Sequence, residues 1–461
     1  MKPLTIKTII EAVSGKLIQG SRDILIKSVS TDTRTLKSGE LFIALRGEKH
    51  DAHNFVSEAV RSGAAALIVD KNITVDERIP IIRVDDTTKA LQDLASYYRL
   101  QFPDLPVIAI TGSTGKTTTK DILAAILKEK YTVLKSRGNY NNYIGLPLTL
   151  FRLTGREDIA VLELGMSELG EIESLTSIAR PETGIITNVG PTHLEFLKTV
   201  ENVALGKSEL IKGLPTRGTA ILNYDNKYVR DMAGVFSGKK IIYYGFEPKA
   251  DVYCQQFQLD KENFSTDFVI NYYGRKKRLK INKPGKFIIY NSLAAIAAAR
   301  EYEVSWQQIE RGLMAVELSS LRLDIQQAAG MTVINDTYNA NPLSMKAAID
   351  SLLNMADRKT IAVLGAMLEL GPREQSAHLE LGEYAARSGI DILITVGELG
   401  KIIAEGALNS RDNLTVIAAE NNNEAATKLL ELGKENDTVL LKGSRAVKME
   451  EILTLIKGED K

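Results

Sequence analysis

The chain has 461 residues, and its 58 Lys and Arg residues balance its 58 Asp and Glu residues, so the formal net charge is zero. At about 150 residues per domain, this length is too great for one core and predicts three domains. Because no basic excess is available to hold nucleic acid or an anionic membrane, we expect a small anionic substrate bound by local groups instead.

Residues 1–85 form the first predicted domain, a small α/β unit. Its sequence has strand, turn and helix character in turn and ends in the strand-like IPIIRVDD. The first twenty residues lack the unbroken apolar stretch of a secretion signal, and no apolar run approaches the ~20 residues of a membrane helix. The lone cysteine, Cys254, excludes an internal disulfide. We therefore expect a cytoplasmic protein without membrane insertion.

The second predicted domain, residues 86–317, carries the most informative motif. The apolar run VIAI precedes TGSTGKTTT (111–119) and the helical pattern KDILAAILKEKY. Backbone N–H groups of such a loop and the positive end of the helix dipole bind phosphate. Lys116 is expected to reach the β- and γ-phosphates of ATP, and the Thr117 hydroxyl to bind Mg²⁺. The predicted nucleotide contacts are Gly112, Ser113, Thr114, Gly115, Lys116, Thr117 and Thr118.

This loop departs from the usual phosphate-loop pattern in one respect. Ile110 stands where G-x-x-x-x-G-K-[ST] has its first glycine, so the loop's own first glycine is Gly112. The shortened form argues against an ordinary motor or GTPase. A Gly-, Ser- and Thr-rich turn with a surface lysine is the alternative, but the coincidence of strand, two glycines, Lys-Thr and helix favours phosphate binding.

Short apolar strands at 157–166, 182–190 and 219–226 alternate with helices and predict a mostly parallel sheet, whose ligands gather at the carboxyl ends of its strands. Glu163 and His193 follow such strands. A carboxylate beside a phosphate loop is a usual Mg²⁺ ligand, although each residue alone is more typical of a solvated loop. Lys207 lies on a helix, where lysine is ordinarily solvated. A β-rich stretch (239–282) follows, and the helix at 291–304 is expected to close the domain.

The third predicted domain, residues 318–461, has five strand candidates, each followed by an amphipathic helix, which predicts a Rossmann-like unit. No GxGxxG follows its first strand, so a dinucleotide is not indicated. NDTYNANPLSM (335–345) places Asp336, Tyr338, Asn339 and Asn341 at a strand end, where turn chemistry and a ligand site are equally open. The same two readings apply to LKGSR (441–445). Arg322, at the junction of the second and third domains, is placed to clamp a phosphate.

Together these motifs resemble the Mur ligase family of ATP-dependent cell-wall ligases. The resemblance spans nearly the whole chain, and NDTYNANPLSM and MLELG are its most specific parts, because they point to the branch that adds a dipeptide. The other motifs that carry it are STDTRTLKSGELFIAL, GEKHDAHNF, TGSTGKTTTK, NYNNYIGLPLTL, LELGMSELGEI, NVGPTHLE and LKGSR.

The resemblance implies roles that the residues alone do not. Lys207 matches the family's carbamylated lysine, whose anionic oxygens can bind Mg²⁺. The implied catalytic residues are Lys116, Glu163, His193 and Lys207, and the implied ligands of two Mg²⁺ ions are Thr117, Glu163, His193 and carbamylated Lys207. Asn291 matches an asparagine near the adenine, while Arg322 and Asp336 match nucleotide contacts. The implied substrate contacts are Thr33, Arg34, Asn142, Tyr338, Asn339 and Asn341, with Thr33 replacing the commoner Ser of a DSR-like motif.

The implied fold has a UDP-substrate domain, a central ATPase and a C-terminal Rossmann-like domain. The implied reaction joins D-alanyl-D-alanine to UDP-N-acetylmuramoyl-tripeptide through an acyl phosphate, in a monomeric enzyme of peptidoglycan precursor synthesis. Three alternatives stay open: a sibling ligase that adds one amino acid, a P-loop ATPase or kinase that forms no peptide bond, and a non-catalytic nucleotide-gated module. One departure is Ala366, where this branch often has an acidic residue. No motif reads whether the tripeptide ends in lysine or diaminopimelate.

Overall fold

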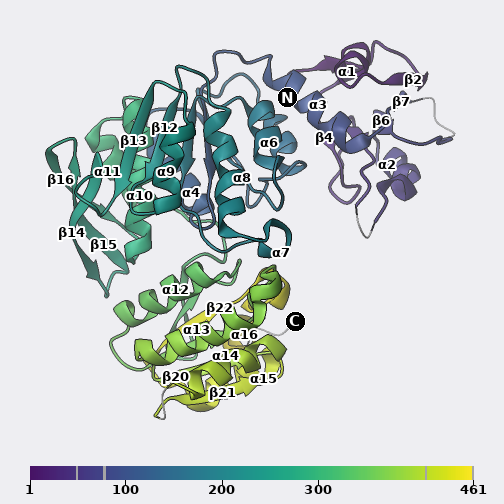
Figure 1. The fold of residues 1–461 in the computed structure, drawn as a ribbon. Helices are drawn as coiled ribbons and strands as arrows, with labels where there is room; N and C mark the ends of the chain where they lie inside the picture. Colours follow the sequence, from purple (N-terminus) through teal and green to yellow (C-terminus); the bar gives the residue numbers. More distant parts are fainter. Residues whose placement is uncertain (48–49, 76–78, 411–412, 459–461) are drawn as a thin grey trace.

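The computed structural model describes residues 1–47, 50–75, 79–410 and 413–458. Glu48 and Lys49 of the GEKHDAHNF motif, and the last three residues of the third predicted domain, lie outside these ranges. Figure 1 shows three bodies along the chain: a small N-terminal one (purple), a large central one (teal) and a C-terminal one (green to yellow) that packs against the central body. The α/β class is confirmed, since each body has its own sheet covered by helices.

The N-terminal body is built on a five-stranded sheet with a parallel core. Its order is β2 (Lys16–Gln19), β7 (Ile81–Arg83), β6 (Ala66–Val69), β5 (Leu41–Ile43) and β4 (Val29–Ser30), and only β2 runs antiparallel to its neighbour. The helices are α1 (Ile6–Ala12), η1 (Ala52–Phe55) and α2 (Val56–Arg61), and β1 (Leu4–Thr5) pairs with β3 (Leu25–Ile26). The helix α3 (Thr87–Arg99), capped by Asp86, then leads to the central body.

The central sheet has nine strands and holds the phosphate loop near its middle. Its order is β16 (Arg275–Ile281), β15 (Ser265–Tyr272), β14 (Val252–Asp260), β13 (Lys240–Gly245), β12 (Thr219–Asn223), β11 (Thr183–Ile186), β8 (Val107–Thr111), β10 (Ile159–Glu163) and β9 (Val133–Lys135). In this spatial order, all strands from β9 to β14, including β8, are parallel to their neighbours. Strands β14, β15 and β16 form an antiparallel extension. The predicted parallel sheet and the β-rich stretch after it are therefore confirmed.

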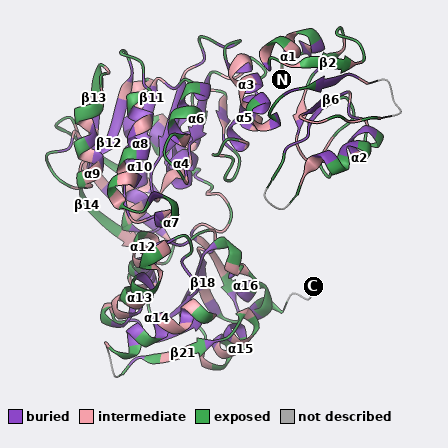
Figure 2. Ribbon diagram, turned by 45° about the vertical axis from the view of Figure 1, so that its right-hand side comes forward, coloured by how far each residue is buried: buried purple, intermediate pink, exposed green. Residues whose placement is uncertain are grey.

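Strand β8 is buried on both faces, as the apolar run VIAI predicts. Ile108 and Ile110 belong to a core with helices α4 (Lys116–Lys128), α10 (Lys286–Glu301) and α11 (Trp306–Met314). Val107 and Ala109 belong to the opposite core with α3, α5 (Gly145–Leu150), α6 (Glu171–Ala179) and α8 (Val200–Lys212). Figure 2 shows these strands buried beneath helices on both faces. The remaining helical segments are α7 (Leu194–Leu197), α9 (Lys227–Asp231) and η2 (Met232–Val235).

The expectation that the helix at 291–304 closes the central domain is wrong. Helix α11 follows it, begun by a capping box in which Ser305 and Gln308 satisfy each other's backbone N–H groups. Its Gly312 lies so close to α4 that a Cβ there would be 2.5 Å from Cα of Ile126. Helix α11 is therefore part of the layer that supports the phosphate-loop helix.

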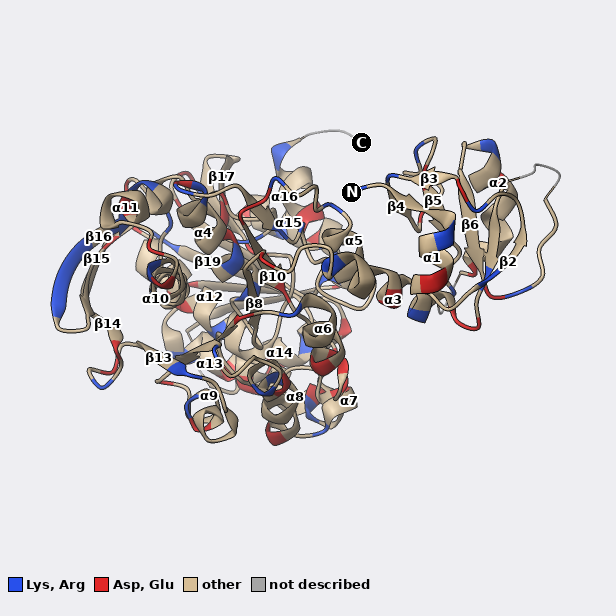
Figure 3. Cartoon of the chain, turned by 90° about the horizontal axis from the view of Figure 1, so that it is seen from above, with Lys and Arg blue, Asp and Glu red and all other residues tan. Residues whose placement is uncertain are grey.

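The outer strand β16 is densely basic, with the sequence RKKRLK over residues 275–280. Figure 3 shows this blue strand at the rim of the central body. Charged side chains on an edge strand discourage pairing with a strand of another chain. We therefore interpret this basic run as protection of the sheet edge.

The C-terminal sheet has the order β17 (Asp324–Ala328), β18 (Met331–Asn335), β22 (Thr438–Lys442), β19 (Thr360–Leu364), β20 (Ile392–Val396) and β21 (Thr415–Ala419). The five predicted strands are confirmed and parallel; β17 was not predicted and forms an antiparallel edge. The helices are α12 (Pro342–Met355), α13 (Glu374–Ser388), α14 (Glu398–Leu408), α15 (Asn422–Leu432) and α16 (Glu450–Lys457), with short turns η3 (Gly371–Arg373) and η4 (Arg445–Val447). None of the helices in the described part of the chain has both the length and the apolar character needed to span a bilayer.

Candidate active site

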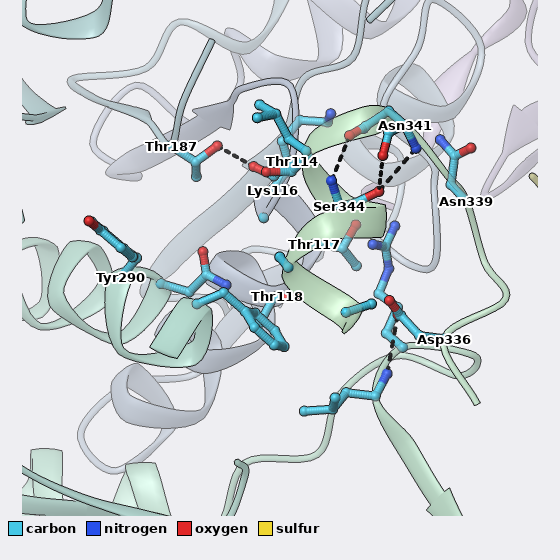
Figure 4. A pocket seen from close by; sticks show the side chains of 18 of the residues that line it. Thr114, Lys116, Thr117, Thr118, Thr187, Tyr290, Asp336, Asn339, Asn341 and Ser344 are labelled. Carbon is cyan, nitrogen blue, oxygen red and sulfur yellow. Dashed lines mark hydrogen bonds between the residues drawn. The ribbon is translucent and has the colours of Figure 1, made fainter. Parts of the chain in front are cut away.

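A cavity of about 250 Å³ lies between the central and C-terminal bodies. Its walls come from the phosphate loop, the carboxyl ends of β11 and β12, helix α10, the linker after α11, and the C-terminal elements β18, β22 and α12. Figure 4 shows side chains from both bodies pointing into the same space. Among the predicted site residues, those that line the cavity are Ser113, Thr114, Gly115, Lys116, Thr117, Thr118, Asn291, Arg322, Asp336, Asn339 and Asn341.

Two glycines let the phosphate loop approach its neighbours. Gly115 has φ +81° and directly precedes α4, and a Cβ there would lie 2.6 Å from Oδ1 of Asn291. Gly112 has φ +151°, and a Cβ there would lie 1.8 Å from Oγ1 of Thr187. Both glycines are therefore required by backbone conformation and by space. Gly115 and the first turn of α4 line the cavity, and the free N–H groups of a helix's first turn form an anion site.

The segment after β11 holds the loop from behind. The Thr114 N–H donates to Oδ1 of Asn188 (2.9 Å), and the Thr187 hydroxyl donates to the Thr114 carbonyl (2.5 Å). The Ser113 hydroxyl donates to the Gly190 carbonyl (3.1 Å) and accepts from the Gly190 N–H (3.0 Å). The loop conformation is thus set by hydrogen bonds before any ligand arrives. Sequence reasoning missed Thr187 and Asn188, although both stand at a strand end.

Lys116 folds back on its own loop. Its Nζ donates to the Gly112 carbonyl at 2.7 Å. Burial lowers the pKa of the Lys116 ammonium, the charge of Glu163 opposes this shift, and Arg322 adds to it. A cation that is partly removed from water and holds only a backbone carbonyl gains much from an incoming phosphate.

Glu163 ends β10 and is 1% exposed. Its Oε1 accepts from the Asn141 amide at 2.8 Å, whereas its Oε2 has no hydrogen-bond partner and lies 3.6 Å from Nζ of Lys120. Lys120 is fully buried and also donates to the Gly138 carbonyl (3.1 Å). Sequence reasoning missed Lys120, yet its spacing was a signal, since it follows Lys116 by four residues on the same helix face.

Lys207 is buried on α8 at 2% exposure, packed with the apolar residues Val203, Leu210 and Ile211. Burial, and then the nearby charge of Lys116, hold the pKa of the Lys207 ammonium well below its usual range. A lowered pKa increases the fraction of neutral amine, which is the form that reacts with carbon dioxide, and Lys116 would stabilise the anion produced. The chemistry of this position therefore fits carbamylation.

His193 precedes α7 with φ +55°, and its Nδ1 lies 2.6 Å from Oε2 of Glu369 in the MLELG motif. This close contact with His193 lowers the pKa of the Glu369 carboxyl. Within the described residues, no group of three or more His, Cys, Asp or Glu side chains gathers as a metal site. The donors still suit Mg²⁺, because Oε2 of Glu163, which has no hydrogen-bond partner, and the buried Thr117 hydroxyl are hard oxygen ligands.

A buried lysine, Lys442, holds the C-terminal wall of the cavity. The sequence singled it out only as part of the LKGSR motif. Nζ of Lys442 donates to Oδ2 of Asp336 (2.5 Å) and to the Asn339 carbonyl (3.0 Å). The Arg322 guanidinium stacks over the Tyr338 ring at 4.1 Å, and its Nε is buried without a hydrogen-bond partner. Such an unpaired donor in a cavity wall suits a phosphate or carboxylate.

Asn341 has a structural role that the sequence left open. Its Oδ1 accepts from the Ser344 N–H (2.9 Å), and the Ser344 hydroxyl accepts from the Asn341 N–H (3.0 Å), which completes a capping box for α12. Asn291 likewise accepts from the Thr119 hydroxyl at 3.2 Å. Both amides thus fix the cavity's shape while lining it.

Three predicted substrate residues lie away from this cavity. Thr33 and Arg34 are in the turn after β4 on the N-terminal body, where the exposed Arg34 pairs with Asp32 at 2.6 Å. Asn142 lies in the turn before α5, where its Oδ1 accepts from the Gly145 N–H (2.9 Å), and it lines a second cavity with Tyr143 and residues of α6. A substrate that contacts all three must extend from the N-terminal to the central body.

Three protein-family models match successive parts of the chain. The model described as Mur ligase family, catalytic domain, matches residues 25–99; the Mur ligase middle domain matches residues 110–299; and the Mur ligase, glutamate ligase domain, matches residues 321–445. The matches follow the order of the three bodies, and the middle one contains the phosphate loop, Glu163, His193 and Lys207.

The chain is also similar over its full length to curated and solved proteins. It is 38% identical to UDP-N-acetylmuramoyl-tripeptide--D-alanyl-D-alanine ligase of Bacillus subtilis, with 97% of each chain covered. A crystal structure of MurF from Acinetobacter baumannii superposes with a TM-score of 0.91 at 32% identity, covering 100% of both chains. MurF ligase from Thermotoga maritima in complex with ADP gives a TM-score of 0.83 at 29% identity, covering 94% of this chain and 97% of that one.

Proposed function

The chain belongs to the Mur ligase family, and we propose that it is an ATP-dependent ligase that joins D-alanyl-D-alanine to UDP-N-acetylmuramoyl-tripeptide. The observation that carries the proposal is the cavity itself, where a preformed phosphate loop faces the NDTYNANPLSM segment across a domain junction. The full-length similarity to ligases of this specificity supports the choice of substrates.

ATP occupies this cavity, with its phosphates on the loop and the N-terminus of α4. Lys116 leaves the Gly112 carbonyl and follows the γ-phosphoryl group as it moves, because charge develops there in the transition state. Arg322 supplies a second positive group from the linker, and Asn291 and Asp336 bind the nucleoside end. The similarity to a ligase solved in complex with ADP supports nucleotide binding by this chain.

The acceptor of the phosphoryl group is the terminal carboxylate of the tripeptide. The resulting acyl phosphate is attacked by the free amine of D-alanyl-D-alanine, and the tetrahedral intermediate expels inorganic phosphate to leave a peptide bond. Water would hydrolyse the acyl phosphate, so the junction between the bodies has to exclude it. Placing the cavity walls on two bodies serves that purpose, since docking of the C-terminal body covers the loop.

Two Mg²⁺ ions would supply positive charge along the phosphoryl path, held by Thr117, Glu163, His193 and a carbamylated Lys207. Oε2 of Glu163, which has no hydrogen-bond partner, and the lowered pKa of Lys207 support these ligands. In the structure Lys120 provides the positive charge nearest to that oxygen, at 3.6 Å.

The uridine end of the substrate binds residues 1–85 through Thr33 and Arg34, residues 86–317 form the ATPase, and residues 318–461 close over both. Asn142, Tyr338, Asn339 and Asn341 contact the peptide portions. We further propose that the enzyme acts in the cytoplasm. We also propose that it acts as a monomer, because one chain supplies every wall of the cavity.

Release of ADP and phosphate tests this function. Purified enzyme with ATP and Mg²⁺ is expected to release phosphate only when both UDP-muramoyl tripeptide and D-alanyl-D-alanine are present. Equal release without the dipeptide would reject a ligase in favour of an ATPase or kinase. Release with a single amino acid in place of the dipeptide would assign the chain to a sibling ligase.

A further inference from the structure

The MLELG loop reaches from the C-terminal body to the short helix that follows His193. It runs from the end of β19 to η3, and the Glu195 N–H donates to the Glu369 carbonyl at 3.2 Å. Gly371 comes so close that a Cβ there would lie 2.9 Å from Cα of Glu195. The loop is therefore seated on α7 by its backbone, and its Glu369 side chain points at the imidazole of His193.

A buried frame holds this loop from the C-terminal side. His378 is fully buried and accepts the Met367 N–H on Nε2 (2.9 Å), while its Nδ1 lies 2.6 Å from the Glu374 carbonyl and donates to it. These two hydrogen bonds fix its tautomer, and burial lowers the pKa of His378. Ser444 accepts the Leu368 N–H at 3.0 Å. Groups of the C-terminal body thus hold the two residues before Glu369, while the Glu195 N–H holds the Glu369 carbonyl from the central body.

Both partners of the contact have left-handed backbone conformations, which non-glycine residues seldom adopt. Glu369 has φ +64° and His193 has φ +55°. Such conformations are unfavourable for residues other than glycine and persist where the surroundings fix them, most often at functional sites. The two conformations bring the carboxylate Oε2 to 2.6 Å from Nδ1.

We propose that Glu369 is a positioning residue for His193, so that the C-terminal body completes the orientation of a ligand side chain in the central body. A carboxylate at Nδ1 favours the N–H tautomer there and leaves the Nε2 lone pair free, which is the arrangement that partners of metal-binding histidines commonly enforce. This inference rests on the proposed role of His193, and it gives the MLELG motif a function. When the C-terminal body moves away, His193 loses its orientation.

Mn²⁺ titration of the enzyme with saturating ADP, followed by electron paramagnetic resonance, tests the proposal without turnover. Glu369→Ala is expected to weaken Mn²⁺ binding about tenfold to a hundredfold, the range for loss of a ligand's carboxylate partner. Glu369→Asp should recover part of the loss. In a His193→Ala background, adding Glu369→Ala should change the affinity less than twofold, because the partner acts only through that histidine.

Glu380→Ala is the matched control, since Glu380 is a half-exposed carboxylate of the same body that pairs with Arg373 at 3.1 Å. It should bind Mn²⁺ like the wild type. Wild-type Mn²⁺ affinity in Glu369→Ala, or an equal further loss in the His193→Ala background, would overturn the positioning role. Neither muramoyl substrate nor dipeptide is present, so a failed ligase assay and a failed Mn²⁺ assay remain distinguishable.

Discussion

The two walls of the cavity are built in different ways. The loop wall comes from one continuous strand, loop and helix between Val107 and Lys128, and the segment after β11 fixes its backbone. The opposite wall combines the linker at Arg322 and the end of β18 with the end of β22, which comes more than a hundred residues later in sequence. The first wall is organised within the central body, whereas the second depends on docking. We infer that the phosphates bind first to the loop wall, and that docking of the C-terminal body then completes the site.

Removing the cation of the loop wall should have the largest effect. Lys116→Ala is expected to lower kcat about a thousandfold, because no other group can follow the γ-phosphoryl charge from within the loop. Lys128→Ala, at the exposed end of the same helix, is the control and should retain wild-type kcat. ADP formation in the presence of both substrates measures both variants. A Lys116→Ala enzyme within tenfold of wild type would contradict the central place of this wall.

Replacing Lys207 tests whether a carbamate on this residue contributes to the loop wall. Lys207→Ala should reduce activity by about a hundredfold or more, without recovery in high bicarbonate but with partial recovery in short carboxylic acids, which can replace the lost oxygens. Lys212→Ala, exposed in the last turn of the same helix, should behave as wild type. Full activity of Lys207→Ala would remove the carbamate from the mechanism.

Arg322 tests the wall that depends on docking. Arg322→Ala is expected to raise KM for ATP about tenfold to a hundredfold, because a charge-assisted hydrogen bond contributes about 1.5–3 kcal/mol. Arg322→Lys should recover little, since lysine neither stacks on Tyr338 in the same way nor binds a phosphate bidentately. The exposed Arg358 supplies the control variant Arg358→Ala. An unchanged KM for ATP in Arg322→Ala would place the nucleotide on the loop wall alone.

A smaller effect is expected where the linker meets the loop wall. Asp121 on α4 accepts from both the N–H (2.9 Å) and the hydroxyl (2.7 Å) of Ser319. Burial acts to raise the pKa of Asp121, but Lys120, Lys135 and Ser319 outweigh it and the pKa is lowered. Because the folded-state pKa is lower than the ordinary value of about 4, the ionised carboxylate stabilises the fold at pH values above about 4. That stability is lost as the pH falls through the folded-state pKa.

Ser319→Ala should therefore lower the free energy of unfolding by about 1.5–3 kcal/mol at pH 7, and the difference from wild type should shrink as the solution is acidified below pH of about 4. Urea denaturation at several pH values measures this, with the exposed Ser177→Ala as control. A difference that is the same at all pH values would show that the hydroxyl does not act through the charged carboxylate.

The features that the sequence predicts are local ones, like those of the loop wall, and the features that it does not predict are contacts between distant segments. The phosphate loop, Glu163 at a strand end and the five C-terminal strands follow from local patterns, and the structure contains each of them. The pairing of Lys120 with Glu163 spans 43 positions and that of His193 with Glu369 spans 176, as the residue numbers give, so no spacing rule identifies either. Strand β17 was missed because its DIQQA sequence lacks the apolar alternation of a buried strand.

Formation of the acyl phosphate depends on both walls of the cavity. The loop wall delivers the phosphoryl group, and the docked wall must keep water away from the acyl phosphate. Tripeptide substrate labelled with oxygen-18 in its terminal carboxylate tests this step most directly, with the released phosphate analysed by mass spectrometry. The account predicts that one labelled oxygen passes from each carboxylate to inorganic phosphate as the peptide bond forms. Peptide formation with unlabelled phosphate would contradict it, because the carboxylate oxygen would then never have been phosphorylated.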